Sequence, residues 1–125
     1  MKQLLLIGLG GFIGSIARYL VSKLNISWQF YNIPMGTLAV NILGSLLIGF
    51  ISGLLIHSIT SSENLKLFFI TGICGGFTTF SAFTFENMQL IQSGHNTTAV
   101  IYISISVVFG ILAVIGGLSL SKLFI

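Results

Sequence analysis

The chain has 125 residues, of which 54% are apolar and only 6% are charged. Soluble domains carry about 25% charged residues. The five Lys and Arg and two Glu of this chain cannot supply the polar coat that water requires. Because a lipid bilayer is the solvent in which such a composition is stable, the sequence predicts a membrane protein with one domain, residues 1–125.

The formal net charge of +3 does not indicate a nucleic-acid partner. The cations are scattered along the chain, and no run of them could follow a phosphate backbone. They are Lys2, Arg18, Lys23, Lys66 and Lys122. The single cysteine excludes a disulfide within the chain and a cysteine metal cluster, so we expect Cys74 to be a small buried residue.

Four stretches of the sequence are long enough to cross a bilayer, which takes about 20 apolar residues in a helix. They cover approximately residues 4–24, 35–56, 65–91 and 99–120. The first stretch imitates a secretory signal peptide, but no clean cleavage site follows it, so we expect it to remain as the first crossing. The sequence therefore predicts an all-α membrane protein with four transmembrane helices.

Polar residues fill the three connections between these stretches. The first connection carries Trp28 and Tyr31, which suit the membrane interface. In the second, Thr60 or Ser62 is a plausible cap for the third helix. The third spans residues 92–96. The two histidines, His57 and His95, fall in these connections, and we expect them to be solvated rather than to be ligands.

The sequence carries almost no signal for the direction in which the helices insert. Four crossings place both termini on one side, with the connection between the second and third helices. That side has three cations, whereas the other has Lys23 with Arg18 close by. Since the positive-inside rule acts on such differences, either the signal is simply weak, or the chain inserts in both orientations and pairs with an inverted copy of itself.

Small residues recur along one face of three of the stretches, mostly at steps of four. The second stretch has Thr37, Asn41, Ser45, Gly49 and Gly53. The first has Gly10 and Gly14, and the fourth has Ser106, Gly110, Ala113 and Gly117. Lipid gives helices little hydrophobic reason to associate, so close packing depends on small residues. We expect these glycines to serve packing.

Three polar side chains within the apolar stretches need partners. The carboxamide of Asn41 either bonds a neighbouring helix or lines a polar pathway, because unpaired polar groups cost several kcal/mol in lipid. Arg18 either snorkels to the interface or forms an electropositive vestibule that attracts anions. Glu86 either pairs with a cation or caps a polar network.

The residues in the middle of the third stretch have low helix propensity. The pair Gly75-Gly76 is followed by Thr78-Thr79. One interpretation is a packing notch in a continuous helix. The other is a broken helix, whose freed carbonyl groups bind cations and whose freed N–H groups attract anions.

Two phenylalanines follow at helical spacing. Phe80 and Phe83 share a face, and the hydroxyls of Thr79, Ser81 and Thr84 are interleaved with them. The positive edges of the rings would stabilise a passing anion without holding it tightly, which suits conduction. The alternative is that both rings are bulk that faces lipid.

Three segments carry a resemblance to the Fluc (CrcB) family of fluoride channels, which extends over the whole chain. Residues 11–19 resemble the family pattern G-x-x-G-x-x-x-R-[YW], and residues 36–44 resemble its GTLxVNxxG. Residues 72–83 resemble its GxCGGxTTFSTF, which is the most specific of the three. One departure is visible, since Ala82 stands where the family commonly has Thr.

The resemblance implies an antiparallel homodimer of dual topology, with two fluoride pathways, in the inner or plasma membrane. In such a channel Phe80, Phe83 and Asn41 would line each pathway. The carbonyls of Gly75 and Thr78 would hold a central Na⁺ where the two chains meet. Thr79, Ser81 and Thr84 match hydroxyl positions near a polar track, and Arg18 matches an arginine of the first helix whose role is less defined. In the fourth helix either Ser104 or Ser106 would face the pathway, and the small-residue face favours Ser106.

The resemblance thus predicts a passive fluoride exporter, and other functions fit less well. A dual-topology multidrug exporter needs a carboxylate in an early membrane helix, whereas Glu86 comes late. A non-conducting assembly subunit would explain the glycines but not Asn41 beside an interrupted helix. An enzyme is not expected, because the chain has no Asp, no paired carboxylates and no His near a nucleophile in its apolar stretches.

Overall fold

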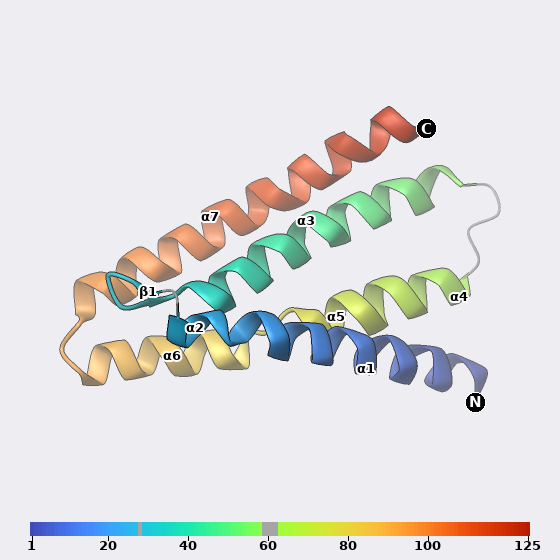
Figure 1. The fold of residues 1–125 in the computed structure, drawn as a ribbon. Helices are drawn as coiled ribbons and strands as arrows, with labels where there is room; N and C mark the ends of the chain where they lie inside the picture. Colours follow the sequence, from blue (N-terminus) through green and yellow to red (C-terminus); the bar gives the residue numbers. More distant parts are fainter. Residues whose placement is uncertain (28, 59–62) are drawn as a thin grey trace.

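The computed structural model describes residues 1–27, 29–58 and 63–125, so the predictions for Trp28, Thr60 and Ser62 lie outside the described residues. Four helical spans run along the molecule (Figure 1), and each is long and apolar enough to cross a membrane. They cover Lys2–Ser22, Met35–His57, Glu63–Gln92 and Asn96–Phe124. The prediction of a four-helix membrane architecture is confirmed, and the chain is a multi-pass membrane protein.

The first two spans are the regular helices α1 (Lys2–Ser22) and α3 (Met35–His57). The fourth is α7 (Asn96–Ser121), which begins three residues before the predicted start at Ala99 and continues into the short 3₁₀-helix η2 (Lys122–Phe124). Gly94, with φ of 82°, provides the turn before α7, and a Cβ added there would meet nothing within 4 Å.

The connection between α1 and α3 has more structure than the sequence suggested. It contains the one-turn helix α2 (Leu24–Ser27) and an antiparallel hairpin of β1 (Gln29–Phe30) and β2 (Ile33–Pro34). The hairpin turns at Tyr31 and Asn32, which both have positive φ. Two such residues make the tight turn that suits strand twist, but Tyr-Asn is not the Asn-Gly pair that signals this turn in a sequence.

The third span is built from four successive elements. The short α4 (Glu63–Leu65) leads into a π-helix, η1 (Lys66–Cys74), followed by α5 (Gly75–Phe77). Residues 78–80 are not helical, and Thr78 is extended, with φ of −82° and ψ of 154°. The helix α6 (Ser81–Gln92) completes the span. A π-helix is wider than an α-helix and is frequent at functional sites.

The helices pack in two pairs through glycines. In one pair α1 lies along η1 and α5, and in the other α3 lies along α7 (Figure 1). A Cβ added at Gly14 would lie 2.8 Å from Phe77 N, and one added at Gly117 would lie 2.6 Å from Phe50 N. No larger residue fits where two backbones approach so closely. The packing role predicted for these glycines agrees with this arrangement.

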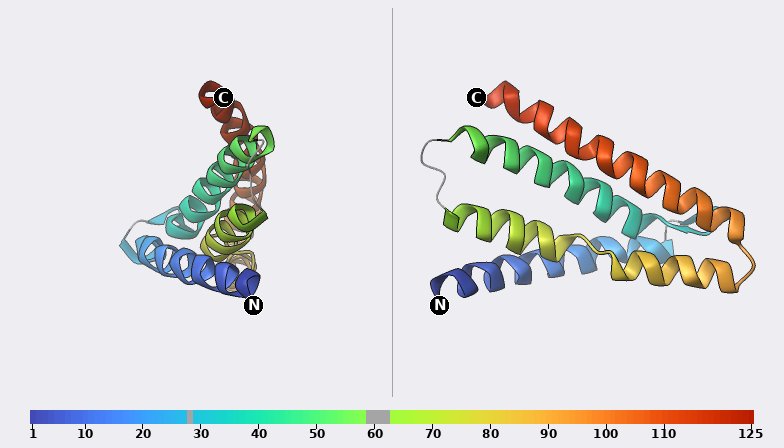
Figure 2. Two further views of the ribbon diagram at one scale, coloured as in Figure 1. Left: turned by 90° about the vertical axis from the view of Figure 1, so that its right-hand side faces the viewer. Right: turned by 180° about the vertical axis from the view of Figure 1, so that it is seen from behind.

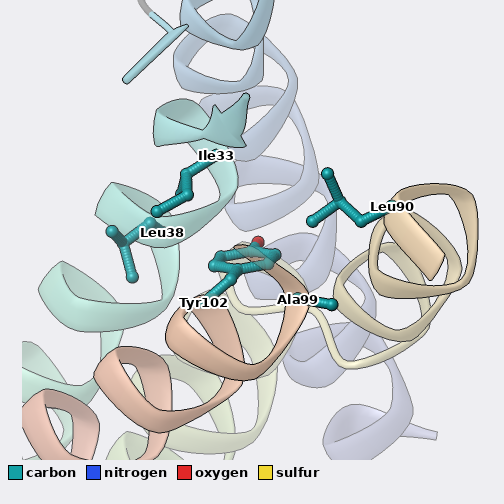
Figure 3. Close-up of a cluster of buried hydrophobic side chains, with 5 residues drawn as sticks. All are labelled: Ile33, Leu38, Leu90, Ala99 and Tyr102. Carbon is teal, nitrogen blue, oxygen red and sulfur yellow. The ribbon is translucent and has the colours of Figure 1, made fainter. Parts of the chain in front are cut away.

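Both termini lie at the same end of the molecule, as four crossings require (Figure 2). A small core closes the opposite end, where the ring of Tyr102 is fully buried among apolar side chains (Figure 3). These are Ile33, Leu38, Leu90 and Ala99. The outward faces of the long helices instead carry exposed Leu, Ile, Val and Phe, which is the surface that lipid requires.

Candidate functional site

The side chain of Asn41 lies against the non-helical segment of the third span. Its Nδ2 donates to the carbonyl oxygen of Thr79 at 3.1 Å, and its Oδ1 accepts from the Thr79 N–H at 3.0 Å. Both polar ends of the carboxamide are therefore bonded to the main chain of one residue. Asn41 was expected either to bond a neighbouring helix or to line a polar pathway. These two hydrogen bonds join it to the neighbouring third span. The residue also borders a groove.

That groove has a volume of about 360 Å³ and lies between α3, the non-helical segment, α6 and α7. It brings together five residues singled out in the sequence, namely Asn41, Thr79, Phe80, Phe83 and Ser106. Gly44 and Ser45 of α3 also line it. Three separate stretches of the chain thus contribute their polar and aromatic residues to one open space.

The two serines of α7 differ in how their hydroxyls are bonded. The hydroxyl of Ser104 donates to the carbonyl of Val100 in its own helix at 2.8 Å and is exposed. The hydroxyl of Ser106 lies at the groove, is shielded from solvent, and has no hydrogen-bond partner in the described residues. A buried hydroxyl without a partner costs about 1–3 kcal/mol. Of the two candidates, only Ser106 has a free hydroxyl at the groove.

Aromatic rings form a row beside this groove. The centroids of Phe80 and Phe83 are 6.1 Å apart, and those of Phe83 and Tyr102 are 5.0 Å apart in an edge-to-face arrangement. Phe80 remains 76% exposed in the single chain, whereas Tyr102 is fully buried. The row therefore leads from the outer surface of the chain into its core.

The three predicted hydroxyls do not lie together in the groove. Thr79 Oγ1 accepts from the Ala82 N–H at 3.2 Å, which caps the first turn of α6. Ser81 and Thr84 are exposed, and neither lines the groove. The hydroxyl of Thr84 donates to the Ser81 carbonyl at 3.0 Å, within its own helix. Of the three residues, only Thr79 lines the groove, whereas Ser81 and Thr84 lie outside it.

Arg18 and Glu86 line a second cavity, of about 320 Å³, between α1, α3 and α6. Thr79 borders both this cavity and the groove, so the non-helical segment lies between the two spaces. Ser15 and Ala82 also line the second cavity. No ion pair joins Arg18 to Glu86 in the described part of the chain, which leaves the guanidinium available to the cavity.

Glu86 completes a polar network, which was one of its two predicted roles. Its Oε1 accepts from the Thr37 hydroxyl at 2.6 Å, and its Oε2 accepts from the Tyr102 hydroxyl at 3.1 Å. Asn25 closes the network, since its Nδ2 donates to Thr37 Oγ1 at 3.0 Å and its Oδ1 accepts from the Thr37 N–H at 2.9 Å. Asn25 and Tyr102 were not among the predicted site residues. A tyrosine within an apolar span, whose hydroxyl needs a partner, was the available signal.

The interruption also leaves main-chain groups without partners. Among the described residues, no N–H donates to the carbonyls of Gly75 and Thr78, the two groups expected to hold a cation. The face of Gly75 is open, because a Cβ added there would meet only the Ile70 carbonyl oxygen, at 3.8 Å. Carbonyl oxygens are the ligands that hard cations prefer. The described residues offer no cluster of His, Cys, Asp or Glu as an alternative metal site.

The four apolar spans define a membrane protein of several crossings, and the groove lies beside the non-helical residues of its third span. Comparison with known proteins agrees. The chain belongs to the CrcB-like protein, Camphor Resistance (CrcB) family, whose model matches residues 5–118. The resemblance drawn from the three sequence motifs is thereby confirmed.

Proteins similar to this chain along almost their full length carry one name, fluoride-specific ion channel FluC. The protein of Azobacteroides pseudotrichonymphae is 45% identical over 124 residues, which is 99% of each chain. That of Rhizobium meliloti is 41% identical over 98% of each chain. That of Chlorobium phaeobacteroides strain BS1 is 46% identical over 97% of this chain and 94% of its own.

Proposed function

We propose that this protein is a fluoride channel that lets fluoride leave the cytoplasm passively across the cell membrane. The observation that carries the proposal is that full-length relatives at 41–46% identity are named fluoride-specific ion channels. The groove supports it, because Ser106 provides a free hydroxyl at the row of phenylalanine rings. Fluoride is small and strongly hydrated, so a pathway has to replace its water with donors.

The groove supplies weak donors of two kinds. The hydroxyl of Ser106 is one, and the ring edges of Phe80 and Phe83, which carry positive partial charge, are the other. Neither kind carries a full charge, so an anion is stabilised and can still leave, as conduction requires. Arg18 provides the long-range attraction in the second cavity, on the other side of Thr79.

The working unit in this proposal is an antiparallel homodimer with two pathways. Support comes from the ring of Phe80, which is 76% exposed in one chain and would be covered by a second. The near-equal cation counts of the two ends suit insertion in both orientations.

The free carbonyls of Gly75 and Thr78 fit the Na⁺ that the family resemblance implies, because an oxygen donor without a hydrogen bond is available at each. A cation bound there supplies a positive charge that favours nearby anions. Two chains related by a two-fold axis would each contribute the same two oxygens, which places the ion between them.

The test is fluoride efflux from liposomes that contain the purified protein, recorded with a fluoride electrode and compared with chloride efflux. We expect rapid fluoride efflux and little chloride efflux. Phe80→Ile and Phe83→Ile remove the ring edges, and each should slow fluoride efflux by about fivefold, since one lost ring interaction is worth about 1 kcal/mol. Both variants should still elute as dimers.

Efflux no faster than from empty liposomes would refute the proposal. Replacing sodium by potassium throughout tests the cation separately, and we expect slower efflux without sodium. A normal rate in sodium-free buffer would remove the cation from the proposal and leave the fluoride pathway standing.

A further inference from the structure

The pairing of Asn41 with Thr79 does more than border the groove. In a continuous α-helix each N–H donates to the carbonyl four residues earlier. The Thr79 N–H would then donate to Gly75, and the Thr79 carbonyl would accept from the N–H of Phe83. In the structure both groups of Thr79 are instead bonded to Asn41.

The two groups that lose these helical partners stay free. Neither the Gly75 carbonyl nor the Phe83 N–H makes a hydrogen bond within the described ranges. One is a free acceptor on the N-terminal side of the interruption, and the other is a free donor at the start of α6, next to a phenylalanine ring of the groove. A single carboxamide thus accounts for one carbonyl and one N–H that make no hydrogen bond within the described ranges.

We propose that Asn41 is a positioning residue, which keeps the third span open by taking the two hydrogen bonds that would otherwise continue the helix through residues 75–83. It acts on fluoride through the groups that it leaves free, not as a ligand of the ion. This inference rests on the proposed function, since it explains how that pathway is held open.

The chemistry of the side chain fits this role closely. The Thr79 peptide presents one donor and one acceptor, and a carboxamide matches them with one acceptor and one donor. The opposite orientation of the amide would face donor to donor and acceptor to acceptor. Ionised Asp lacks the donor and Leu lacks both groups, so at a pH that keeps Asp ionised two substitutions of similar size separate the two hydrogen bonds.

The test measures amide hydrogen exchange at single residues by NMR on the full chain in lipid nanodiscs. In Asn41→Leu the helical bonds can form, so exchange at the Phe83 N–H should slow by roughly fivefold or more. In Asn41→Asp the Thr79 N–H keeps its acceptor, so Thr79 should exchange as in the parent while Phe83 slows. Fluoride efflux should fall in both variants, and further in Asn41→Leu.

A purely structural role of Asn41 predicts faster amide exchange in the variants, because lost packing would speed exchange at the Phe83 N–H and along α3. That result would overturn the proposal. Reduced efflux with unchanged exchange at Phe83 would also overturn it, since Asn41 would then act on the ion directly. If Asn41→Leu does not fold, the nearly isosteric Asn41→Asp still gives both amide readings.

The matched control is Leu43→Ala, two residues further along α3, where the side chain is 47% exposed and lines neither the groove nor the second cavity. It should leave the exchange of Thr79 and Phe83 unchanged. Failure of the proposed function would be seen in the parent protein, which would then give no fluoride efflux from liposomes. That result is independent of the amide exchange rates.

Discussion

At the scale of single residues, the position of a hydroxyl matters less than whether it already has a partner. The hydroxyls of Thr84 and Ser104 donate hydrogen bonds to carbonyl oxygens of their own helices. Ser106 does not, although its oxygen is shielded from solvent. Among the described residues this oxygen has no hydrogen-bond partner, and it lies at the groove that Phe80 and Phe83 line.

This difference predicts opposite effects on stability and activity for Ser106→Ala. Removing an unsatisfied buried hydroxyl should leave the free energy of unfolding unchanged or raise it by up to about 1 kcal/mol, while fluoride efflux falls. Thermal unfolding in detergent and liposome efflux measure the two effects. Ser104→Ala is the control and should leave efflux unchanged. A less stable Ser106→Ala variant with normal efflux would show that the hydroxyl is structural.

Residue identities alone predicted part of the candidate site. Asn41, Thr79, Phe80 and Phe83 were selected from their types and spacing, and Ser106 was one of two serines considered for the position that the family resemblance implies. The groove brings these five residues together. Their roles with fluoride stay predictions. The sequence could not reveal that Asn25, Thr37 and Tyr102 surround Glu86, because hydrogen bonds between residues up to 49 positions apart depend on how helices pack.

At the scale of elements, the pairing of α1 with the third span is set by backbone contact. Gly14 of α1 faces the junction of η1 and α5, where an added Cβ would lie 2.8 Å from Phe77 N and 3.1 Å from the Gly76 carbonyl carbon. Gly8, on the same helix, faces open space. The two glycines of one helix therefore differ in their surroundings, and only Gly14 belongs to the small-residue face of the sequence.

This contrast gives a prediction with its own control. Gly14→Ala should destabilise the protein by about 1–3 kcal/mol, because neither backbone can withdraw without moving a helix. Gly8→Ala should be neutral or stabilising by up to about 1 kcal/mol, since Ala is the better helix former. Denaturation in detergent compares the variants. Equal effects of the two substitutions would show that close approach of α1 does not control the packing.

The interruption of the third span was an open question in the sequence. The Gly and Thr residues indicated either a notch or a break, and the chain is not helical over residues 78–80. Propensity alone could not decide this, because glycines are tolerated inside packed membrane helices. The hairpin of β1 and β2 was missed for a related reason, since Tyr31 and Asn32 adopt positive φ without a glycine.

At the scale of the whole molecule, two features bear on the proposed antiparallel dimer. Phe80, an aromatic of the groove, is 76% exposed, and the charges at the two ends nearly balance. A chain with three cations at one end and two at the other has little preference for either orientation. Both features follow if copies of the chain insert in opposite directions and meet across this surface.

Dual topology predicts labelling from both sides of the membrane. Ile125 is exposed at the end that holds both termini. We expect a cysteine introduced by Ile125→Cys, in a Cys74→Ser background, to react with a membrane-impermeant maleimide from each side in about equal amounts. The Cys74→Ser parent should not react. Reaction from one side only would exclude the antiparallel dimer and leave the single-chain groove unaffected.

The amino-acid sequence by itself determined that this is an integral membrane protein with four membrane-spanning helices. Composition and length suffice for that, because the bilayer demands about 20 apolar residues per helix whatever the helices do next. Only the tertiary structure decided that Asn41 bonds the main chain of Thr79, that Ser106 keeps a free hydroxyl and that Glu86 holds Thr37 and Tyr102. Those facts depend on which backbones approach one another, and that is a property of packing rather than of any local pattern.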